Sequence, residues 1–126
     1  QGDKLEFTYV NGKRAGSAKY TWADGSYELS VYDENGQQSG PAKLVWANGA
    51  VREGQKLNGK WHGQVFYTFS EGPRKGKKDQ EHWENGELIT SKKFYGKGET
   101  FEVEEWDDLN KMTDLTKNPT PMRSLS

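Results

Sequence analysis

Residues 35–49 read NGQQSGPAKLVWANG, which is the best-preserved copy of a pattern that organises the whole chain. It begins and ends on an Asn-Gly dipeptide, which favours a two-residue hairpin turn because both central positions need a positive φ. Between the two dipeptides, Ala42, Leu44 and Trp46 stand at every second position. A period of two places these three side chains on one face of a strand. The stretch therefore predicts a turn, a strand and a second turn.

This block recurs along the chain at a regular interval. Its first glycine stands at residues 12, 36, 59 and 86, so the intervals are 24, 23 and 27 residues. In the first three copies a second glycine, an aromatic residue and a closing glycine recur in step: Gly16, Gly40 and Gly63; Trp22, Trp46 and Phe69; Gly25, Gly49 and Gly72. A fourth copy, from Asn85, is degraded because Thr90 stands where the second glycine is expected. Such regularity predicts a repeat array.

Each repeat supplies about two short strands, which are too few to bury a core alone. Stacked hairpins predict an all-β fold, an elongated single-layer antiparallel β-meander over residues 1–105. The repeat blocks lie near residues 11–34, 35–57 and 58–84, with a degraded block over residues 85–105 that ends in a strand at Phe101 and Val103. The face opposite the rings is rich in Ser, Lys, Thr and Gln, so we expect it to be solvated.

Residues 106–126 differ in composition and predict a C-terminal tail, either a short helix followed by extended chain or an extended tail throughout. Asp107 and Asp108 favour the start of a helix. Apolar residues then recur at intervals of three and form one stripe: Trp106, Leu109, Met112 and Leu115. Prolines at positions 119 and 121 end any such helix.

The bulk composition narrows the function classes. The 126 residues carry a net charge of −1, so wholesale nucleic-acid binding is unsupported. No cysteine is present, which excludes disulfides and thiolate chemistry, and no apolar run is long enough to span a membrane. The chain starts at Gln1 rather than Met. This start fits a processed secreted protein and equally a domain cut from a longer chain.

At these glycines and aromatic residues, the sequence resembles the MORN (membrane occupation and recognition nexus) repeat family. That family repeats about every 23 residues around Tyr-x-Gly-x-[Trp/Phe]-x-x-Gly-x-x-x-Gly-x-Gly, and residues 54–63, GQKLNGKWHG, fit it best. The resemblance covers roughly residues 5–95. The resemblance is to a divergent array, because Ala18, Ala42 and Val65 stand in place of the family's third glycine.

The resemblance implies an elongated β-meander with one grooved face. Such arrays bind a partner peptide or helix, or form homodimers, and membrane association was the family's original proposal. By resemblance the compartment is cytoplasmic or membrane-peripheral, while the non-Met start keeps a secreted protein open.

The first candidate site is the ring-bearing face of the array. Its residues are Tyr20, Trp22, Leu44, Trp46, Tyr67 and Phe69. A single sheet has no second layer, so this face is either the core of the array, covered by the C-terminal tail, or a groove for a partner.

The second candidate is a basic loop that carries Arg74, Lys75, Lys77 and Lys78. It would contact an anionic lipid or an acidic partner, and the alternative is a solvated loop without a ligand.

No catalytic constellation, metal site or cofactor motif is predicted. His62 and His82 lack metal-ligand spacing, and no nucleophile motif surrounds any serine. We therefore expect a non-enzymatic binding or scaffold module that engages a protein partner or itself through the aromatic groove. The alternatives are peripheral binding to anionic lipid through the basic loop, and a secreted carrier of a small apolar ligand.

Overall fold

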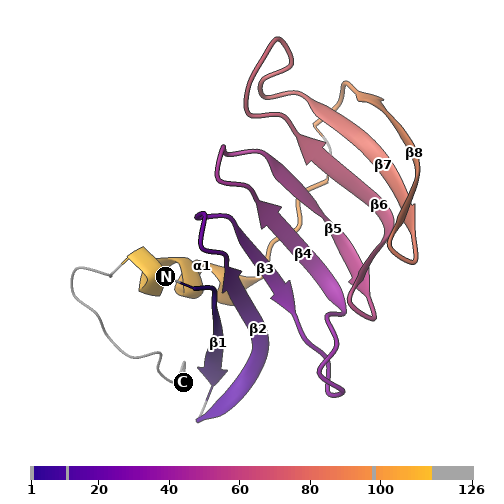
Figure 1. Cartoon of the computed structure of the whole chain (residues 1–126). Coiled ribbons are helices and arrows are strands. Elements are labelled where there is room, and N and C mark those ends of the chain that lie inside the picture. Colours follow the sequence, from indigo (N-terminus) through magenta and orange to yellow (C-terminus); the bar gives the residue numbers. More distant parts are fainter. Residues whose placement is uncertain (1, 11, 98, 115–126) are drawn as a thin grey trace.

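The computed structural model describes residues 2–10, 12–97 and 99–114 of the chain. These residues form one eight-stranded antiparallel sheet in which each strand pairs with its neighbours in sequence, followed by one helix (Figure 1). The elements are β1 (Lys4–Val10), β2 (Lys13–Thr21), β3 (Tyr27–Val31), β4 (Gly40–Val45), β5 (Val51–Leu57), β6 (Lys60–Thr68), β7 (Lys78–Glu84), β8 (Glu87–Phe94) and α1 (Glu104–Asp114). The predicted single-layer meander with a short C-terminal helix is confirmed.

The hairpin turns are of two kinds. Asn58 and Gly59 both have positive φ, 52° and 82°, as a two-residue turn requires. At positions 48 and 49 only Gly49 has a positive φ. This loop is longer: the N–H of Trp46 donates to the carbonyl of Ala50 (2.9 Å), so three residues lie between the paired positions. The prediction of two-residue turns at both ends of residues 35–49 is therefore wrong. The Asn48 side chain instead accepts a hydrogen bond from the N–H of Ala50 (2.9 Å), which holds a three-residue loop.

The second glycine of each repeat has a backbone conformation that only glycine adopts readily. Gly16, Gly40 and Gly63 have φ values of 95°, 119° and 84°, a region that other residues rarely adopt. A Cβ atom at Gly16 would also lie 3.1 Å from the carbonyl oxygen of Tyr32. The backbone therefore approaches closely at Gly16.

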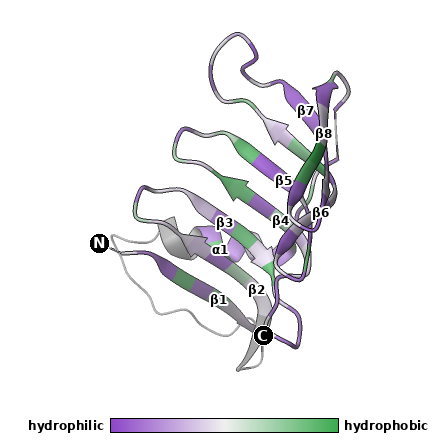
Figure 2. Ribbon diagram, turned by 45° about the vertical axis from the view of Figure 1, so that its right-hand side comes forward, coloured by the Kyte–Doolittle hydropathy of each residue, from purple (hydrophilic) through white to green (hydrophobic). Residues whose placement is uncertain are grey.

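The register places the predicted ring positions on one face of the sheet, which we call the aromatic face. Tyr20 lies opposite Glu28, Glu28 opposite Leu44, Leu44 opposite Arg52, and Arg52 opposite Tyr67. Directly opposed residues in an antiparallel sheet point to the same side. Figure 2 shows the accompanying alternation of apolar and polar positions along the strands.

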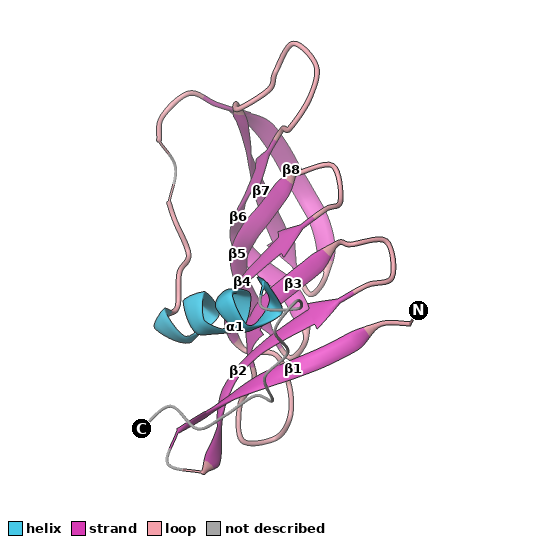
Figure 3. Ribbon diagram, turned by 90° about the vertical axis from the view of Figure 1, so that its left-hand side faces the viewer, coloured by secondary structure: helices cyan, strands magenta, loops and turns pink. Residues whose placement is uncertain are grey.

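The other face carries the helix, and the expectation that this face is solvated is wrong over the first strands. Thr21 lies opposite Tyr27, so Tyr27, Leu29 and Val31 point away from the aromatic face. Leu29 packs there against Trp106 and Leu109 of α1, and these three side chains are at most 3% exposed. Figure 3 shows α1 and the segment that leads to it on one side of the sheet.

Polar contacts also attach the C-terminal segment to that face. The Trp106 indole N–H donates to the backbone carbonyl of Ser30 (3.2 Å), and the Lys19 ammonium donates to Asn110 (3.0 Å). Lys43 pairs with Glu102 at 2.7 Å. Some of the side chains that the sequence pattern indicates as solvated therefore contact the C-terminal segment instead of water.

The helix begins at Glu104, three residues before the start that Asp107 and Asp108 predict, and the acidic residues of its first turn are Glu104, Glu105 and Asp107. The expected strand at Phe101 and Val103 is wrong, because both residues lie in the non-helical approach to α1, where Phe101 is buried. The side chain of Met112, and all of Leu115 and the two prolines, lie outside the described residues. The division of the chain at residues 105 and 106 stays a prediction. Among the described residues, no helix is long and apolar enough to cross a bilayer.

Candidate binding surface

The six predicted groove residues lie on the aromatic face in two groups. Tyr20 and Trp22, at the end of β2, have ring centroids 4.9 Å apart. The second group lies at β6 and the end of β4. The ring centroid of Tyr67, on β6, lies 5.6 Å from that of Trp46 and 4.9 Å from that of Phe69. Leu44 of β4 lies between the two groups.

The second group surrounds a cation that belongs to the protein itself. The Arg52 guanidinium lies 5.2 Å from the ring centroids of Trp46 and Tyr67 and 5.3 Å from that of Trp83. It also makes two hydrogen bonds of 3.0 Å to the carboxylate of Glu81, which is 5% exposed. We call these five residues the Arg52 cluster. Trp46 and Tyr67 are therefore held by an internal contact.

The sequence pattern missed three members of the Arg52 cluster: Arg52, Glu81 and Trp83. The sequence pattern gives no signal for them, because the position of Arg52 opposite Tyr67, which places it on the same face, follows from the strand register. The indole N–H of Trp83 donates to Glu81 (2.9 Å), which completes the hydrogen bonding of that carboxylate.

The predicted basic loop divides into paired and exposed cations. Arg74 lies 4.6 Å from the centre of the Phe69 ring and pairs with Asp79 at 2.6 Å. Lys78 donates to the Thr68 hydroxyl (2.7 Å). Lys75 and Lys77 are exposed to solvent. Two of the four cations, Lys75 and Lys77, are therefore the ones available to a ligand.

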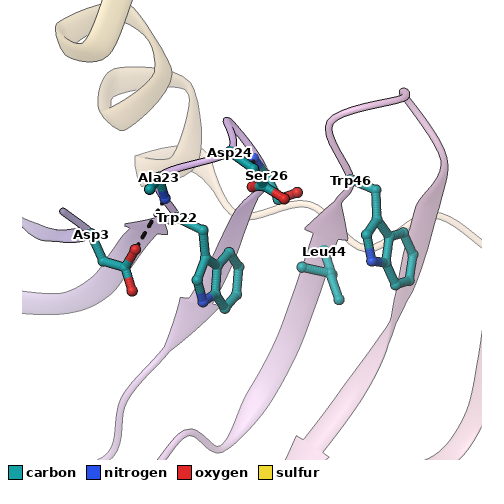
Figure 4. Close-up of a pocket in the computed structure, with 7 residues that line it drawn as sticks. All are labelled: Asp3, Trp22, Ala23, Asp24, Ser26, Leu44 and Trp46. Carbon is teal, nitrogen blue, oxygen red and sulfur yellow. Dashed lines mark hydrogen bonds between the residues drawn. The ribbon is translucent and has the colours of Figure 1, made fainter. Parts of the chain in front are cut away.

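The open part of the aromatic face is a hollow of about 470 Å³ between two indoles, which we call the tryptophan hollow (Figure 4). Its lining residues are Asp3, Trp22, Ala23, Asp24, Ser26, Leu44 and Trp46. Trp22 is 36% exposed, and Ser26 is buried. Ser26, a small residue immediately before β3, leaves the space between the rings, because β3 separates β2 from β4.

Two carboxylates stand at the rim of the tryptophan hollow. Asp3 accepts hydrogen bonds from the Tyr20 hydroxyl (2.8 Å) and the N–H of Ala23 (3.0 Å), and the bond to Asp3 raises the pKa of the Tyr20 phenol. Asp24 accepts from the N–H of Ser26 (2.8 Å), and this bond lowers the pKa of the Asp24 carboxyl below its usual range. The rim therefore carries two carboxylates.

The two histidines do not meet on the sheet. His62 lies opposite Gln55 on β5, whereas His82 of β7 lies opposite Thr90 and pairs with Glu84 at 3.0 Å. Within the part of the chain that the structure describes, no three His, Asp or Glu side chains come together as metal ligands. The surface offers rings, an anionic rim and an open hollow, which are suited to recognition.

These features define a class of protein, a β-hairpin repeat array with one ring-lined face. The MORN repeat family model matches three times, over residues 8–27, 34–51 and 53–74. The chain therefore belongs to the MORN repeat family, as the glycine spacing indicates. Comparison with curated proteins gives no match. MORN repeats are a non-catalytic module that generally mediates protein or membrane binding.

Proposed function

We propose that this protein is a non-enzymatic binding module that engages a protein partner, or a second copy of itself, through the aromatic face. The observation that supports this most is the position of Trp22 beside an open hollow, on the face that α1 leaves uncovered. Exposed tryptophan beside a concave surface is typical of interface hot spots.

The contact surface is narrower than the six residues that the sequence predicts. Tyr67 is held in the Arg52 cluster, and Phe69 is covered by Arg74. Trp22 and Leu44 line the tryptophan hollow, and Trp46 lies between the hollow and the Arg52 cluster. We therefore assign the partner contact to the hollow and the structural role to the rest.

The test uses the full chain to isolate a partner, which is then purified and titrated calorimetrically. Trp22→Ala is expected to raise the dissociation constant by about 30-fold, since a central tryptophan contributes about 2 kcal/mol or more to the binding free energy. Leu88→Ala is the matched control, because Leu88 is 48% exposed but lies on β8, away from the hollow. Self-association, followed by sedimentation, should respond in the same way. An unchanged dissociation constant in Trp22→Ala refutes the proposal.

A second candidate function is binding to an anionic membrane surface. Tyr95 is 84% exposed and lines a hollow of about 290 Å³ together with Lys77, Lys78 and Lys97. An exposed aromatic residue among cations is suited to an anionic lipid surface.

This candidate is tested by sedimentation with phosphatidylserine vesicles. Lys75→Glu with Lys77→Glu should abolish binding, and Lys4→Glu with Lys60→Glu controls for net charge because both of those lysines are also exposed. Equal loss in both pairs, or no loss in the first, removes the candidate. Arg74 and Lys78 are unsuitable probes because they hold the sheet together.

A further inference from the structure

Two residues of the tryptophan hollow, Trp22 and Leu44, correspond to two rings of the Arg52 cluster, Trp46 and Tyr67, in the next repeat. Trp22 and Trp46 are 24 residues apart, as are Glu28 and Arg52, and Leu44 and Tyr67 are 23 apart. Leu44 lies opposite Glu28 on the neighbouring strand, as Tyr67 lies opposite Arg52. In the later repeat a guanidinium fills the space over the rings. In the earlier repeat the corresponding position carries a carboxylate.

The Glu28 side chain does not enter the tryptophan hollow. Its carboxylate pairs with Lys56 at 2.7 Å and accepts a hydrogen bond from the Gln38 amide at 2.9 Å. The space that Arg52 fills in one repeat is thus left open beside Trp22 in the other. The fold itself shows which group occupies this kind of space: a guanidinium that lies over the rings and forms a double hydrogen bond to a carboxylate.

The charge of the hollow favours the same group. The seven lining residues include two carboxylates, Asp3 and Asp24, and no cationic side chain. A small apolar ligand would desolvate those carboxylates without compensation, and an anion would be repelled. A planar guanidinium is weakly hydrated, stacks on indole rings and bonds to carboxylates with two parallel donors.

We propose that the tryptophan hollow receives an arginine side chain from a basic segment of a partner protein. This inference rests on the proposed function and specifies its partner. The guanidinium lies between the Trp22 and Trp46 indoles, as Arg52 lies against its own rings, and it donates to the carboxylates of Asp3 and Asp24. The hollow is then the intermolecular counterpart of an internal contact that the next repeat already makes.

The test is a titration of the full chain with the blocked peptide acetyl-Gly-Gly-Arg-Gly-Gly-amide, followed by the indole N–H signals in NMR spectra. Only the Trp22 and Trp46 signals should shift saturably, while that of Trp106, on the opposite face, stays fixed. The matched peptide with citrulline keeps the shape of arginine but removes its charge, and it should bind at least about fivefold more weakly. Equal binding of the citrulline or leucine peptide, or no saturable shift, overturns the inference.

Asp3→Asn with Asp24→Asn provides the complementary change in the protein. Asparagine retains an oxygen that accepts from the N–H groups of Ala23 and Ser26, so the turn keeps its hydrogen bonds while the rim loses its charge. The preference for arginine over citrulline should fall below about twofold. If this variant fails to fold, the wild-type preference measured in low and high salt serves instead, since screening must reduce it. A preference that neither change reduces overturns the inference.

The outcomes separate this inference from the proposed function. If Trp22→Ala weakens binding of the purified partner but the peptides show no arginine preference, the aromatic face is the binding surface and the proposed arginine contact is wrong. If Trp22→Ala leaves the partner unaffected, the proposed function itself is wrong.

Discussion

Replacing Arg52 by methionine tests whether the Arg52 cluster stabilises the sheet. The substitution keeps an apolar chain of similar reach, but it removes the guanidinium from the three rings and from Glu81. Glu81 is 5% exposed, so its carboxylate loses two charged donors and keeps only the N–H of Trp83. An uncompensated buried charge is the most costly consequence.

The expected loss is about 3 kcal/mol in the free energy of unfolding. Breaking a fully buried ion pair costs about 3–5 kcal/mol, and the lower end applies because the Arg52 side chain is 20% exposed. With a urea dependence of about 1.5 kcal/mol per molar for a domain of this size, the unfolding midpoint should fall by about 2 M. Tryptophan fluorescence during urea titration measures this midpoint.

Two further variants make the result specific. A double-mutant cycle of Arg52→Met with Glu81→Gln should give a coupling of about 2 kcal/mol. Lys43→Met is the exposed control, because its partner Glu102 is 55% exposed, and it should cost less than about 1 kcal/mol. A midpoint shift for Arg52→Met no larger than that for Lys43→Met would refute the stabilising role of the cluster.

Three other predictions concern packing within the sheet, the attachment of α1 and the rim of the hollow. Gly54→Ala should destabilise by about 1–3 kcal/mol in urea unfolding, because the added Cβ would lie 2.8 Å from a methyl carbon of Val65; a neutral effect would contradict this close packing. Trp106→Ala should lower the free energy of unfolding by about 3–5 kcal/mol and raise the rate of amide exchange in β3, since the indole is 1% exposed and donates to the carbonyl of Ser30. An unchanged exchange rate would show that α1 does not stabilise β3. Asp24 has its pKa lowered by the N–H of Ser26, so its ionised form stabilises the fold above pH 3.8 and this contribution is lost as pH falls through the lower folded-state value. The difference in melting temperature between wild type and Asp24→Ala should accordingly shrink in acid, and a difference that grows would reverse the sign.

The sequence was sufficient for the meander and the shared face of the rings, because both follow from glycine spacing and a period of two. It was insufficient for the side on which α1 lies. Between β2 and β3 the N–H of Trp22 donates to the carbonyl of Ser26 (2.8 Å), which closes another three-residue loop. This loop sets the register that turns Tyr27 and Leu29 away from Trp22, and a shift of one residue would reverse their face. Lys19 and Lys43 look solvated in the pattern, yet they bond to the C-terminal segment.

The candidate site was predicted as a row of rings but not as two different environments. Which rings are internal depends on Arg52, whose position opposite Tyr67 is a consequence of register. Which rings are open depends on Ser26 and on where the carboxylate of Glu28 turns, and neither follows from periodicity. Sequence patterns place side chains on a face, whereas pairing between side chains decides what remains available to a ligand.

Photo-crosslinking to the purified partner tests most directly whether the tryptophan hollow is the recognition surface. A photoreactive phenylalanine analogue replaces Ala23, which lines the hollow, in one protein and Leu88 in a control, and mass spectrometry locates each adduct. We expect adducts from position 23 alone, in an arginine-containing segment, and suppression of these adducts by the arginine peptide. Equal adducts from both positions, or adducts from position 88 alone, would show that the hollow is not the recognition surface.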